Sequence, residues 1–352
     1  MISHQNVIAN VCQSLYMRQL SQPFTPDRAP PERWLGFLPL YHAYGQLWSI
    51  VAAAVNRTPC YYMRAFNFEM FLKNIQNYKI THIQTAPPVV VMLDKRPETS
   101  RYDLSSLENI LCGAAPLSKD LQNSVSDKFG LKIVQTWGMT EVTCSCLHVP
   151  GGLDDRSGSV GFIDPNSEMK LVDDDGKEVT EPGERGEITV RGPNICLGYW
   201  RNEQATRETF DEDGFMKTGD VAICDDKGWY WIVDRKKELI KVKGFQVAPA
   251  ELEAVLLEND DIADAAVVAL QKDHEELPRA YVVLKDSANG SVKEQDIVQW
   301  VAQKVAKHKR LEGGVVFIDE VPKSPSGKIQ RKVLKDWAKR DADSLSGIRA
   351  KL

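Results

Sequence analysis

The feature that most constrains the fold is the alternation of short apolar runs with helical segments between residues 80 and 141. The run "ITHIQTAPPVVVMLDK" predicts a buried strand, a proline break and a helix start. "ENILCGAAPLSKDLQNSVSDKFG" predicts a strand, a small-residue loop and a helix, with Ser118 as N-cap and Gly130 just past the C-terminus. "LKIVQTWGMTE" predicts another strand that enters a tight turn. Strands that alternate with helices are typical of a parallel, doubly wound α/β sheet.

Two polar loops, 113–116 and 135–141, fall at the carboxyl ends of these predicted strands. Ligands of open parallel sheets bind beyond the carboxyl ends of the strands. The sequence therefore predicts a ligand site where these two loops meet.

The pattern changes after residue 150. "GSVGFIDPNSEMKLVDDDGKEVTEPGERGEITVRG" has short alternating segments separated by turn residues, which predicts a small β-barrel or sandwich. After Asp234 come two basic strands, a helix opened by Pro249, and further strands and helices that predict a compact α+β domain. We therefore expect a partial α/β subdomain over 1–150, a β-barrel over 151–233 and a small α+β domain over 234–352.

Composition excludes several classes of protein. The 352 residues are 43% hydrophobic and 26% charged, as in soluble globular chains of two or three domains. A net charge of −5 gives no global field that attracts nucleic acid, so no nucleic-acid partner is expected. No apolar run approaches ~18 residues, so no membrane span is expected. The seven cysteines form no C-x-x-C pair, which favours a reducing intracellular compartment over a zinc site.

The chain ends in Ala350, Lys351 and Leu352. This ending is a conservative variant of the S-K-L address that an import receptor reads at a free C-terminus. We expect peroxisomal localisation through that receptor, and cytoplasmic localisation otherwise. The first residues lack the basic and apolar regions of a secretory signal.

Two short motifs offer groups that suit a nucleotide. Thr140 and Glu141 follow the turn in "QTWGMTE", where a hydroxyl can donate to a phosphate oxygen and a carboxylate can hold Mg²⁺. "MKTGD" places Asp220 after a glycine turn, and a carboxylate can accept both hydroxyls of a ribose. The structural alternatives are a helix N-cap at Thr140 and an Asx-type turn at Asp220.

Two further motifs offer a lysine and a histidine. "PKSPSGKIQRK" presents Lys328 on a Pro/Ser/Gly loop, where it can stabilise developing negative charge on a carboxylate or phosphate. It is not a Walker loop, because G-x-x-x-x-G-K-[ST] does not occur. "LPLYHAYG" sets His42 between Tyr41 and Tyr44, where an imidazole can act as a base or line a pocket. The alternatives are a flexible surface lysine and a histidine packed among aromatic rings.

The densest basic segment is "DRKKELIKVKGFQVAPAE". It concentrates more lysine beside a buried segment than a surface hairpin needs. Its cations are either a solvated face or contacts for phosphates.

In their order and spacing these motifs resemble the adenylate-forming superfamily of acyl-CoA synthetases, 4-coumarate–CoA ligases and beetle luciferases. The blocks that carry the resemblance are "LPLYHAYG", "GAAPLS", "QTWGMTE", "GSVGFIDPNSEMKLVDDDG", "RGPNICLGYW", "KTGD", "VDRKKELIKVKGFQVAPAELE" and "PKSPSGKIQRK". The resemblance runs from Met1 to about Lys335. The chain looks closest to the 4-coumarate–CoA-ligase-like branch, which has many fungal peroxisomal members. Fungal secondary metabolism is the context that this branch suggests.

The resemblance implies two half-reactions. A carboxylate attacks the α-phosphate of ATP to give an acyl-adenylate and pyrophosphate, and the thiol of CoA then displaces AMP. Between the two steps the small C-terminal domain rotates. ATP, Mg²⁺ and CoA are the expected cofactor and co-substrates, and a small carboxylic acid is the expected partner.

The resemblance also implies roles for individual residues. Adenine would lie against Gly113, Ala114 and Ala115. The acyl pocket and adenine would both be bordered by Gln135 and Trp137. Thr140 would contact the phosphate of AMP, Glu141 would hold Mg²⁺, and Asp220 would bind the ribose. The acyl pocket and the entry of the thiol would be lined by Tyr41 and His42.

In the C-terminal domain, Lys237 would be the hinge and Arg235 would meet the ribose. Lys241, Lys243 and Gly244 would serve thioester formation and the CoA channel, whereas Lys328 would serve adenylation. One domain that brings two lysine sets to one site can also exclude water from a hydrolysable adenylate.

One departure from the family is large. The family's phosphate loop, rich in Ser, Thr and Gly and ending in Pro-Lys-Gly, precedes the segment that matches "MISHQNVIAN", so we expect an N-terminally truncated member. The leading hypothesis is an AMP-forming acyl-CoA ligase for an aryl or medium-chain acid, with the chain as given having little activity alone. The alternatives are a non-catalytic paralogue that binds nucleotide or CoA, and a luciferase-like oxygenase, which Thr143 permits.

Overall fold

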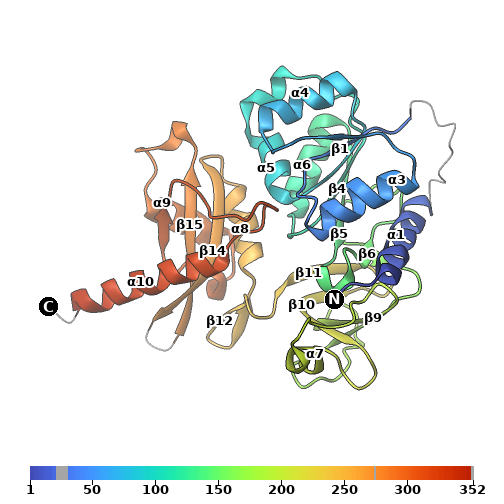
Figure 1. Cartoon of the computed structure of the whole chain (residues 1–352). Helices are drawn as coiled ribbons and strands as arrows, with labels where there is room; N and C mark the ends of the chain where they lie inside the picture. Colours follow the sequence, from blue (N-terminus) through green and yellow to red (C-terminus); the bar gives the residue numbers. More distant parts are fainter. Residues whose placement is uncertain (21–30, 273–274, 350–352) are drawn as a thin grey trace. The chain divides into compact units, whose positions relative to one another are not determined.

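The structure is a computed structural model that describes residues 1–20, 31–272 and 275–349, the last seven of these by backbone alone. The chain divides into two compact units, Met1–Ile232 and Val233–Leu352, which we describe separately (Figure 1). Asp234, the predicted start of the C-terminal domain, is the second residue of the second unit. Among the described residues, no helix combines the length and the apolar character that crossing a bilayer requires.

A seven-stranded sheet with the order β2-β1-β3-β4-β5-β6-β7 organises the first unit. The pairs from β2 to β5 are parallel, as predicted for β3, β4 and β5, and the two pairs after β5 are antiparallel. The strands are β1 (Trp34–Gly36), β2 (Cys60–Tyr62), β3 (His82–Thr85), β4 (Asn109–Cys112), β5 (Lys132–Trp137), β6 (Leu147–His148) and β7 (Phe162–Ile163).

Three helices pack on one face of this sheet and enclose its largest core. They are α4 (Phe68–Tyr78), α5 (Pro87–Lys95) and α6 (Lys119–Phe129), with the 3₁₀ turn η2 (Pro97–Arg101) after α5. Ser118 caps α6 by accepting a hydrogen bond from the N–H of Leu121 at 3.2 Å, and Gly130 ends it with a φ of 64°. Both capping residues were predicted, and both are confirmed.

The opposite face is covered by a helix that the sequence did not predict. Adjacent strand residues point to opposite faces, so Leu35 joins the core under α4–α6 while Trp34 joins a second core with residues of α1 (His4–Gln19). This second core also includes the short run α2 (Ala43–Gly45), the π-helix η1 (Gln46–Ala52) and α3 (Ala53–Val55). Helix α1 buries polar side chains and leaves Ile8 and Tyr16 63% and 56% exposed.

The β subdomain expected after residue 151 forms a four-stranded sheet with the order β11-β10-β9-β8. Its strands are β8 (Glu168–Val172), β9 (Arg185–Arg191), β10 (Met216–Cys224) and β11 (Tyr230–Arg235), with the helix α7 (Glu203–Thr209) between β9 and β10. This sheet has two edge strands, β11 and β8. Hydrogen bonds between Tyr230 and the segment 160–161 join the β11 edge to the chain just before β7. A shared core lies between the two sheets.

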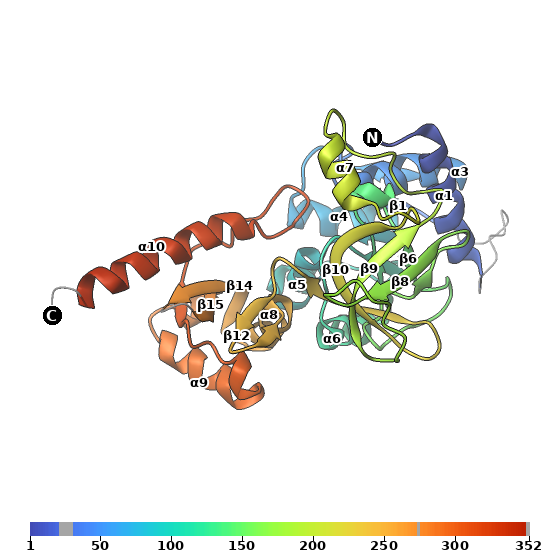
Figure 2. The same ribbon diagram turned by 90° about the horizontal axis from the view of Figure 1, so that it is seen from below.

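The second unit has the order of elements that the sequence predicts. Figure 2 shows α8 and α9 on one side of its sheet and α10 on the other. The elements are β12 (Ile240–Val242), β13 (Phe245–Val247), α8 (Pro249–Leu257), β14 (Ile262–Lys272), β15 (Glu275–Leu284), η4 (Asp286–Ala288), α9 (Glu294–Lys304), η5 (Lys307–Lys309), β16 (Val315–Phe317) and α10 (Arg331–Arg349). The predicted peroxisomal address, Ala350 to Leu352, lies outside the described residues.

Candidate active site

The two loops that the sequence singled out lie at one edge of the large sheet. Strands β3, β4 and β5 are parallel neighbours, with Thr85 paired to Cys112 and Cys112 to Gln135. Their carboxyl ends therefore meet at a single edge, and loop 113–116 and turn 138–141 both leave from it. This is the edge at which open α/β sheets bind ligands.

Loop 113–116 is tightly built around Tyr44. The phenol of Tyr44 donates to the carbonyl of Leu111 at 2.8 Å, and a Cβ on Gly113 would lie 3.4 Å from the Tyr44 ring and 3.0 Å from Thr136. The next residue, Ala114, has a φ of 70°, a left-handed conformation that costs a non-glycine residue roughly 1–2 kcal/mol. Strained backbone of this kind concentrates at ligand sites. The sequence interpretation gave Tyr44 no role, although "YHAY" contained it.

Trp137 and Asp220 meet although 83 positions separate them. The indole Nε1 of Trp137 donates to Oδ2 of Asp220 at 2.9 Å, and the two residues are 6% and 5% exposed. A β-bulge between Lys217 and Val221 places Asp220 there, with Gly219 at a φ of 72°. The bulge brings the predicted ribose ligand to the carboxyl end of β5.

Glu141 is held by a tyrosine that the sequence interpretation did not assign. The phenol of Tyr199 donates to Oε1 of Glu141 at 2.9 Å. Burial, with a contribution from Glu141, raises the pKa of Tyr199 to about 12, so the phenol remains a donor at neutral pH. Tyr199 lies in the block "RGPNICLGYW", which supplied the only sequence signal for it.

The turn that carries Thr140 and Glu141 leaves no space for larger residues. A Cβ on Gly138 would lie 1.8 Å from the carbonyl oxygen of Cys144. Thr143 adopts a φ of 71° and donates from its hydroxyl to the carbonyl of Asn194 at 2.6 Å. The side chain of Thr140, at the start of η3 (Thr140–Val142), is exposed.

Glu141 fits the predicted contact with Mg²⁺ as a single ligand. Mg²⁺ sites of this kind use one or two carboxylates and take the remaining oxygens from substrate phosphates and water. Across the described residues, no group of three or more Asp, Glu, His or Cys side chains could hold a metal ion by itself. A Mg²⁺ here would therefore depend on the phosphates of a nucleotide.

Gln135, near the carboxyl end of β5, holds neighbouring parts of the first unit together. Its amide nitrogen donates to the carbonyl of Leu117 at 3.0 Å and to Oε1 of Gln122 at 2.8 Å, and its Oε1 accepts from the N–H of Leu117 at 3.2 Å. These bonds tie β5 to the start of α6 and so hold the intervening loop. The buried amide contacts protein groups and is not presented to the edge as an open ligand.

Tyr41 and His42 precede the short helix α2. Tyr41 is 82% exposed. The Nδ1 atom of His42 accepts from the N–H of Tyr44 at 3.2 Å, which places the proton of a neutral imidazole on Nε2. His42 is thus fixed in orientation beside the residue that packs on Gly113.

In the second unit, the predicted lysines lie on the β12–β13 hairpin and on a separate loop. Lys241 and Lys243 are exposed on one side of the β12–β13 hairpin, whose turn has Lys243 and Gly244 at φ values of 49° and 86°. Lys328 lies in a closed turn, where its N–H donates to Oγ of Ser324 at 3.2 Å and its carbonyl accepts from the N–H of Ser324 at 2.8 Å. The Lys328 loop is therefore an ordered element. Arg235 and Lys237 are exposed at and just after the end of β11.

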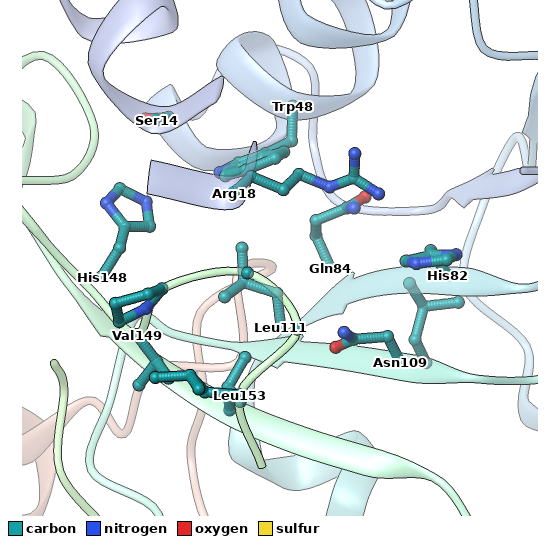
Figure 3. Close-up of a pocket in the computed structure, with 15 residues that line it drawn as sticks. Ser14, Arg18, Trp48, His82, Gln84, Asn109, Leu111, His148, Val149 and Leu153 are labelled. Carbon is teal, nitrogen blue, oxygen red and sulfur yellow. The ribbon is translucent and has the colours of Figure 1, made fainter. Parts of the chain in front are cut away.

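A pocket elsewhere in the first unit contains none of the predicted site residues. Figure 3 shows Gln84, Asn109 and Leu111 rising from β3 and β4 toward Trp48 and Arg18. Its wall includes His82 and Asn109, the first residues of their strands, so it lies away from the carboxyl edge. Arg18 is paired with Glu32 at 2.5 Å; burial raises the pKa of Glu32, but His82 and Arg18 outweigh that effect and lower it. We do not assign the candidate chemistry to this pocket.

Two family models match this chain. Residues 1–200 match the family model described as AMP-binding enzyme, and residues 251–328 match the AMP-binding enzyme C-terminal domain. A probable 4-coumarate–CoA ligase of Dictyostelium discoideum is 41% identical over 338 residues, which cover 95% of this chain and 60% of that protein. The acyl-CoA synthetase ACTT5 of Alternaria alternata is 44% identical over 315 residues, which cover 87% of this chain and 54% of that protein.

The fold also matches a solved structure. The crystal structure of ATP-bound MatB from Rhodopseudomonas palustris has a TM-score of 0.85 at 27% identity, covering 97% of this chain and 65% of MatB. The chain spans about 60% of the length of the Dictyostelium relative. Because the first family model alone matches more than half of the chain, the protein belongs to the AMP-binding enzyme family.

Proposed function

We propose that the protein acts as an ATP-dependent acid–thiol ligase. The carboxylate of an organic acid attacks the α-phosphorus of ATP, the bond to the bridging oxygen of the β-phosphate breaks, and an acyl-adenylate and pyrophosphate form. The thiol of CoA then attacks the acyl carbon, loses its proton, and AMP leaves. The observation that carries this proposal is the convergence of loop 113–116, Trp137 and Asp220 on one sheet edge.

The proposed nucleotide site uses this edge directly. Adenine lies against Gly113 and its two alanine neighbours, because small residues let a flat ring approach the backbone. Asp220, held by Trp137, accepts from the ribose hydroxyls. The exposed hydroxyl of Thr140 donates to the α-phosphate. When bound, Mg²⁺ would take one ligand from Glu141 and neutralise charge on the phosphates.

The proposed acyl pocket lies beside Tyr41, His42 and Tyr44. The aromatic content of this segment favours an aryl or medium-chain acid. The Dictyostelium relative is a probable 4-coumarate–CoA ligase, which also supports an aryl acid. Fungal secondary metabolism remains the context that we propose for this substrate class.

The second unit supplies a different lysine for each half-reaction. Lys328 stabilises negative charge during adenylate formation, whereas Lys241, Lys243 and Gly244 serve thioester formation and the path of CoA. The support is their position on the β12–β13 hairpin and on the separate Lys328 loop of one compact unit. Lys237 is the proposed hinge of that unit.

The test is a comparison of the half-reactions in Lys328→Ala and Lys241→Ala variants. If the short chain is inactive, both are made in a chimera that adds the N-terminal portion of the Dictyostelium relative. We expect Lys328→Ala to reduce ATP–pyrophosphate exchange by about two orders of magnitude, the usual effect of losing one preorganised charge-stabilising group. Lys241→Ala should instead slow thioester formation from preformed adenylate. The control is Lys332→Ala, which removes an exposed cation on α10. If both test variants slow the same half-reaction equally, the two-lysine scheme is contradicted.

We also propose import into peroxisomes through Ala350, Lys351 and Leu352. A fluorescent fusion that leaves this C-terminus free should appear in puncta with a matrix marker. The same fusion without Leu352 should be diffuse. A diffuse signal from the intact fusion contradicts the proposal.

A further inference from the structure

The first turns of α10 contact the segment that begins the second unit. Helix α10 starts at Arg331, three residues after Lys328. Arg331 and Lys335 are four positions apart, so they lie one turn apart on the same side of the helix. The two cations reach different parts of the chain between Asp234 and Glu253.

Arg331 is locked in place by a bidentate ion pair. Its Nη2 donates to Oε2 of Glu253 at 2.9 Å, and its Nη1 donates to Oε1 of Glu253 and, at 2.8 Å, to the carbonyl of Val267. Oε1 of Glu253 also accepts from the N–H of Val267 at 2.8 Å. The guanidinium therefore joins α10, α8 and β14 at a single point, and only its planar fork can make all of these bonds.

Asp234 is the third charged member of this cluster. Its Oδ2 accepts from the N–H of Ala250 at 3.1 Å, in the first turn of α8, and its Oδ1 accepts from the N–H of Arg235 at 2.7 Å. Burial raises the pKa of Asp234, and the charge of Arg331 opposes that rise. The start of the second unit is thus tied to α8, the helix whose Glu253 binds the guanidinium of Arg331.

Lys335 contacts the next part of this segment. Its Nζ lies 2.6 Å from Oε2 of Glu238 and donates to the backbone carbonyl of Lys237 at 3.4 Å. A carbonyl oxygen moves when the backbone torsions of its own residue change. The bond to Lys237 therefore fits one backbone orientation of this residue better than others.

The Lys328 loop is fixed at its exit by the same helix. The N–H of Gln330, next to Arg331, donates to the carbonyl of Pro322 at 2.8 Å and closes the loop. Its side-chain amide donates to the carbonyl of Lys323 at 3.3 Å. A displacement of the first turn of α10 would therefore move both the loop and the segment 234–238.

We propose that Arg331 and Lys335 are positioning residues that couple the Lys328 loop to the hinge at Lys237. Arg331 sets the exit of the loop, and Lys335 holds the backbone at Lys237 and Glu238 in one orientation. This inference rests on the proposed function, in which Lys328 is catalytic and Lys237 is the hinge. The coupling gives the second unit a means to link the position of Lys328 to the state of the hinge.

The first test needs no catalytic activity. Hydrogen exchange of the 352-residue chain is followed by mass spectrometry in peptides that cover 235–242 and 322–330. Lys335→Gln should speed exchange in 235–242 on the order of tenfold, as expected for the loss of one hydrogen bond from a charged group. The reporting amides are those of Glu238 and Leu239, which donate to the carbonyl of Arg235. Lys335→Arg should retain the protection, and Lys332→Gln on the exposed side of α10 should have no effect.

Arg331 is tested with Arg331→Lys, which keeps the charge and loses the fork. We expect faster exchange in both peptides, because the guanidinium lies at the loop exit and binds Glu253 of α8, the helix whose Ala250 N–H binds Asp234. Unchanged exchange in 235–242 for Lys335→Gln, or changes confined to 322–330 for Arg331→Lys, would overturn the coupling.

A second test separates this inference from the proposed function. In a protein that carries out both half-reactions, Lys335→Gln should change the ratio of thioester formation to adenylate formation at an unchanged KM for ATP. An equal fall in both rates would overturn the coupling. If the folded chimera with the N-terminal portion of the Dictyostelium relative has no ligase activity, the proposed function is contradicted, and the exchange experiment alone decides whether the coupling exists.

Discussion

The substitution Asp220→Ala tests the nucleotide site with an effect that follows from the geometry. The carboxylate is 5% exposed and accepts from the indole of Trp137 at 2.9 Å. Its removal leaves a buried N–H without an acceptor, which should lower the stability of the first unit by about 1–3 kcal/mol. Loss of the charged acceptor for a ribose hydroxyl should cost a further 1.5–3 kcal/mol of binding, so AMP affinity should fall roughly 10- to 150-fold.

The two effects are measured separately, by calorimetric titration with AMP and by thermal unfolding. Trp137→Phe removes the indole donor and leaves the carboxylate, so it should weaken AMP binding less than Asp220→Ala does. Asp226→Asn, at an exposed position of the same unit, is the matched control and should change neither quantity. AMP affinity that is unchanged in a folded Asp220→Ala protein would refute the assignment of this edge as the nucleotide site.

Two other predictions concern the first unit. In Gly138→Ala the new methyl group would lie 1.8 Å from the carbonyl oxygen of Cys144, so the turn must open. The free energy of unfolding should fall by about 2 kcal/mol or more, measured as a lower denaturation midpoint. An unchanged midpoint contradicts the tight turn. The exposed apolar side chains of α1 should promote association, so the double variant Ile8→Lys/Tyr16→Lys should increase the monomer fraction in light scattering without lowering stability; association that is unaffected by both lysines places the contact elsewhere.

Elements with local signals could be predicted from the sequence. The cap of α6 at Ser118, its end at Gly130 and the start of α8 at Pro249 all depend on residues within one turn of the helix end. The parallel pairing of β3, β4 and β5 followed from the alternation of strands and helices. The two loops at the carboxyl edge could therefore be placed together before the structure was known.

Helix α1 could not be predicted from hydrophobic periodicity because its buried residues are a mixture of polar and apolar side chains. Asn6 donates to the carbonyls of Pro193 and Ile195 at 2.8 Å, and Asn10 donates to the carbonyl of Ser145 at 2.7 Å. These side chains bind distant backbone groups, while apolar side chains of the same helix face outward. A pattern search that assumes an apolar buried face misses such a helix.

The partners of the site residues were missed for a different reason. Tyr199 and Glu141 are 58 positions apart, and Trp137 and Asp220 are 83 apart. Propensity and periodicity describe only local stretches of chain, so contacts between distant stretches do not follow from them. The resemblance supplied the site residues but not the hydrogen bonds that orient them.

Acid-dependent ATP–pyrophosphate exchange followed by CoA thioester formation tests the central claim most directly. It compares the 352-residue chain with a chimera that adds the N-terminal portion of the Dictyostelium relative, using a panel of aryl and fatty acids. We expect the chimera to exchange pyrophosphate and form a thioester with at least one acid. The 352-residue chain, which spans about 60% of the length of that relative, should be slower by about two orders of magnitude or more if the added portion supplies preorganised donors to the phosphates. A folded chimera without acid-dependent exchange would contradict the ligase assignment, and equal exchange by both proteins would contradict the need for the added portion.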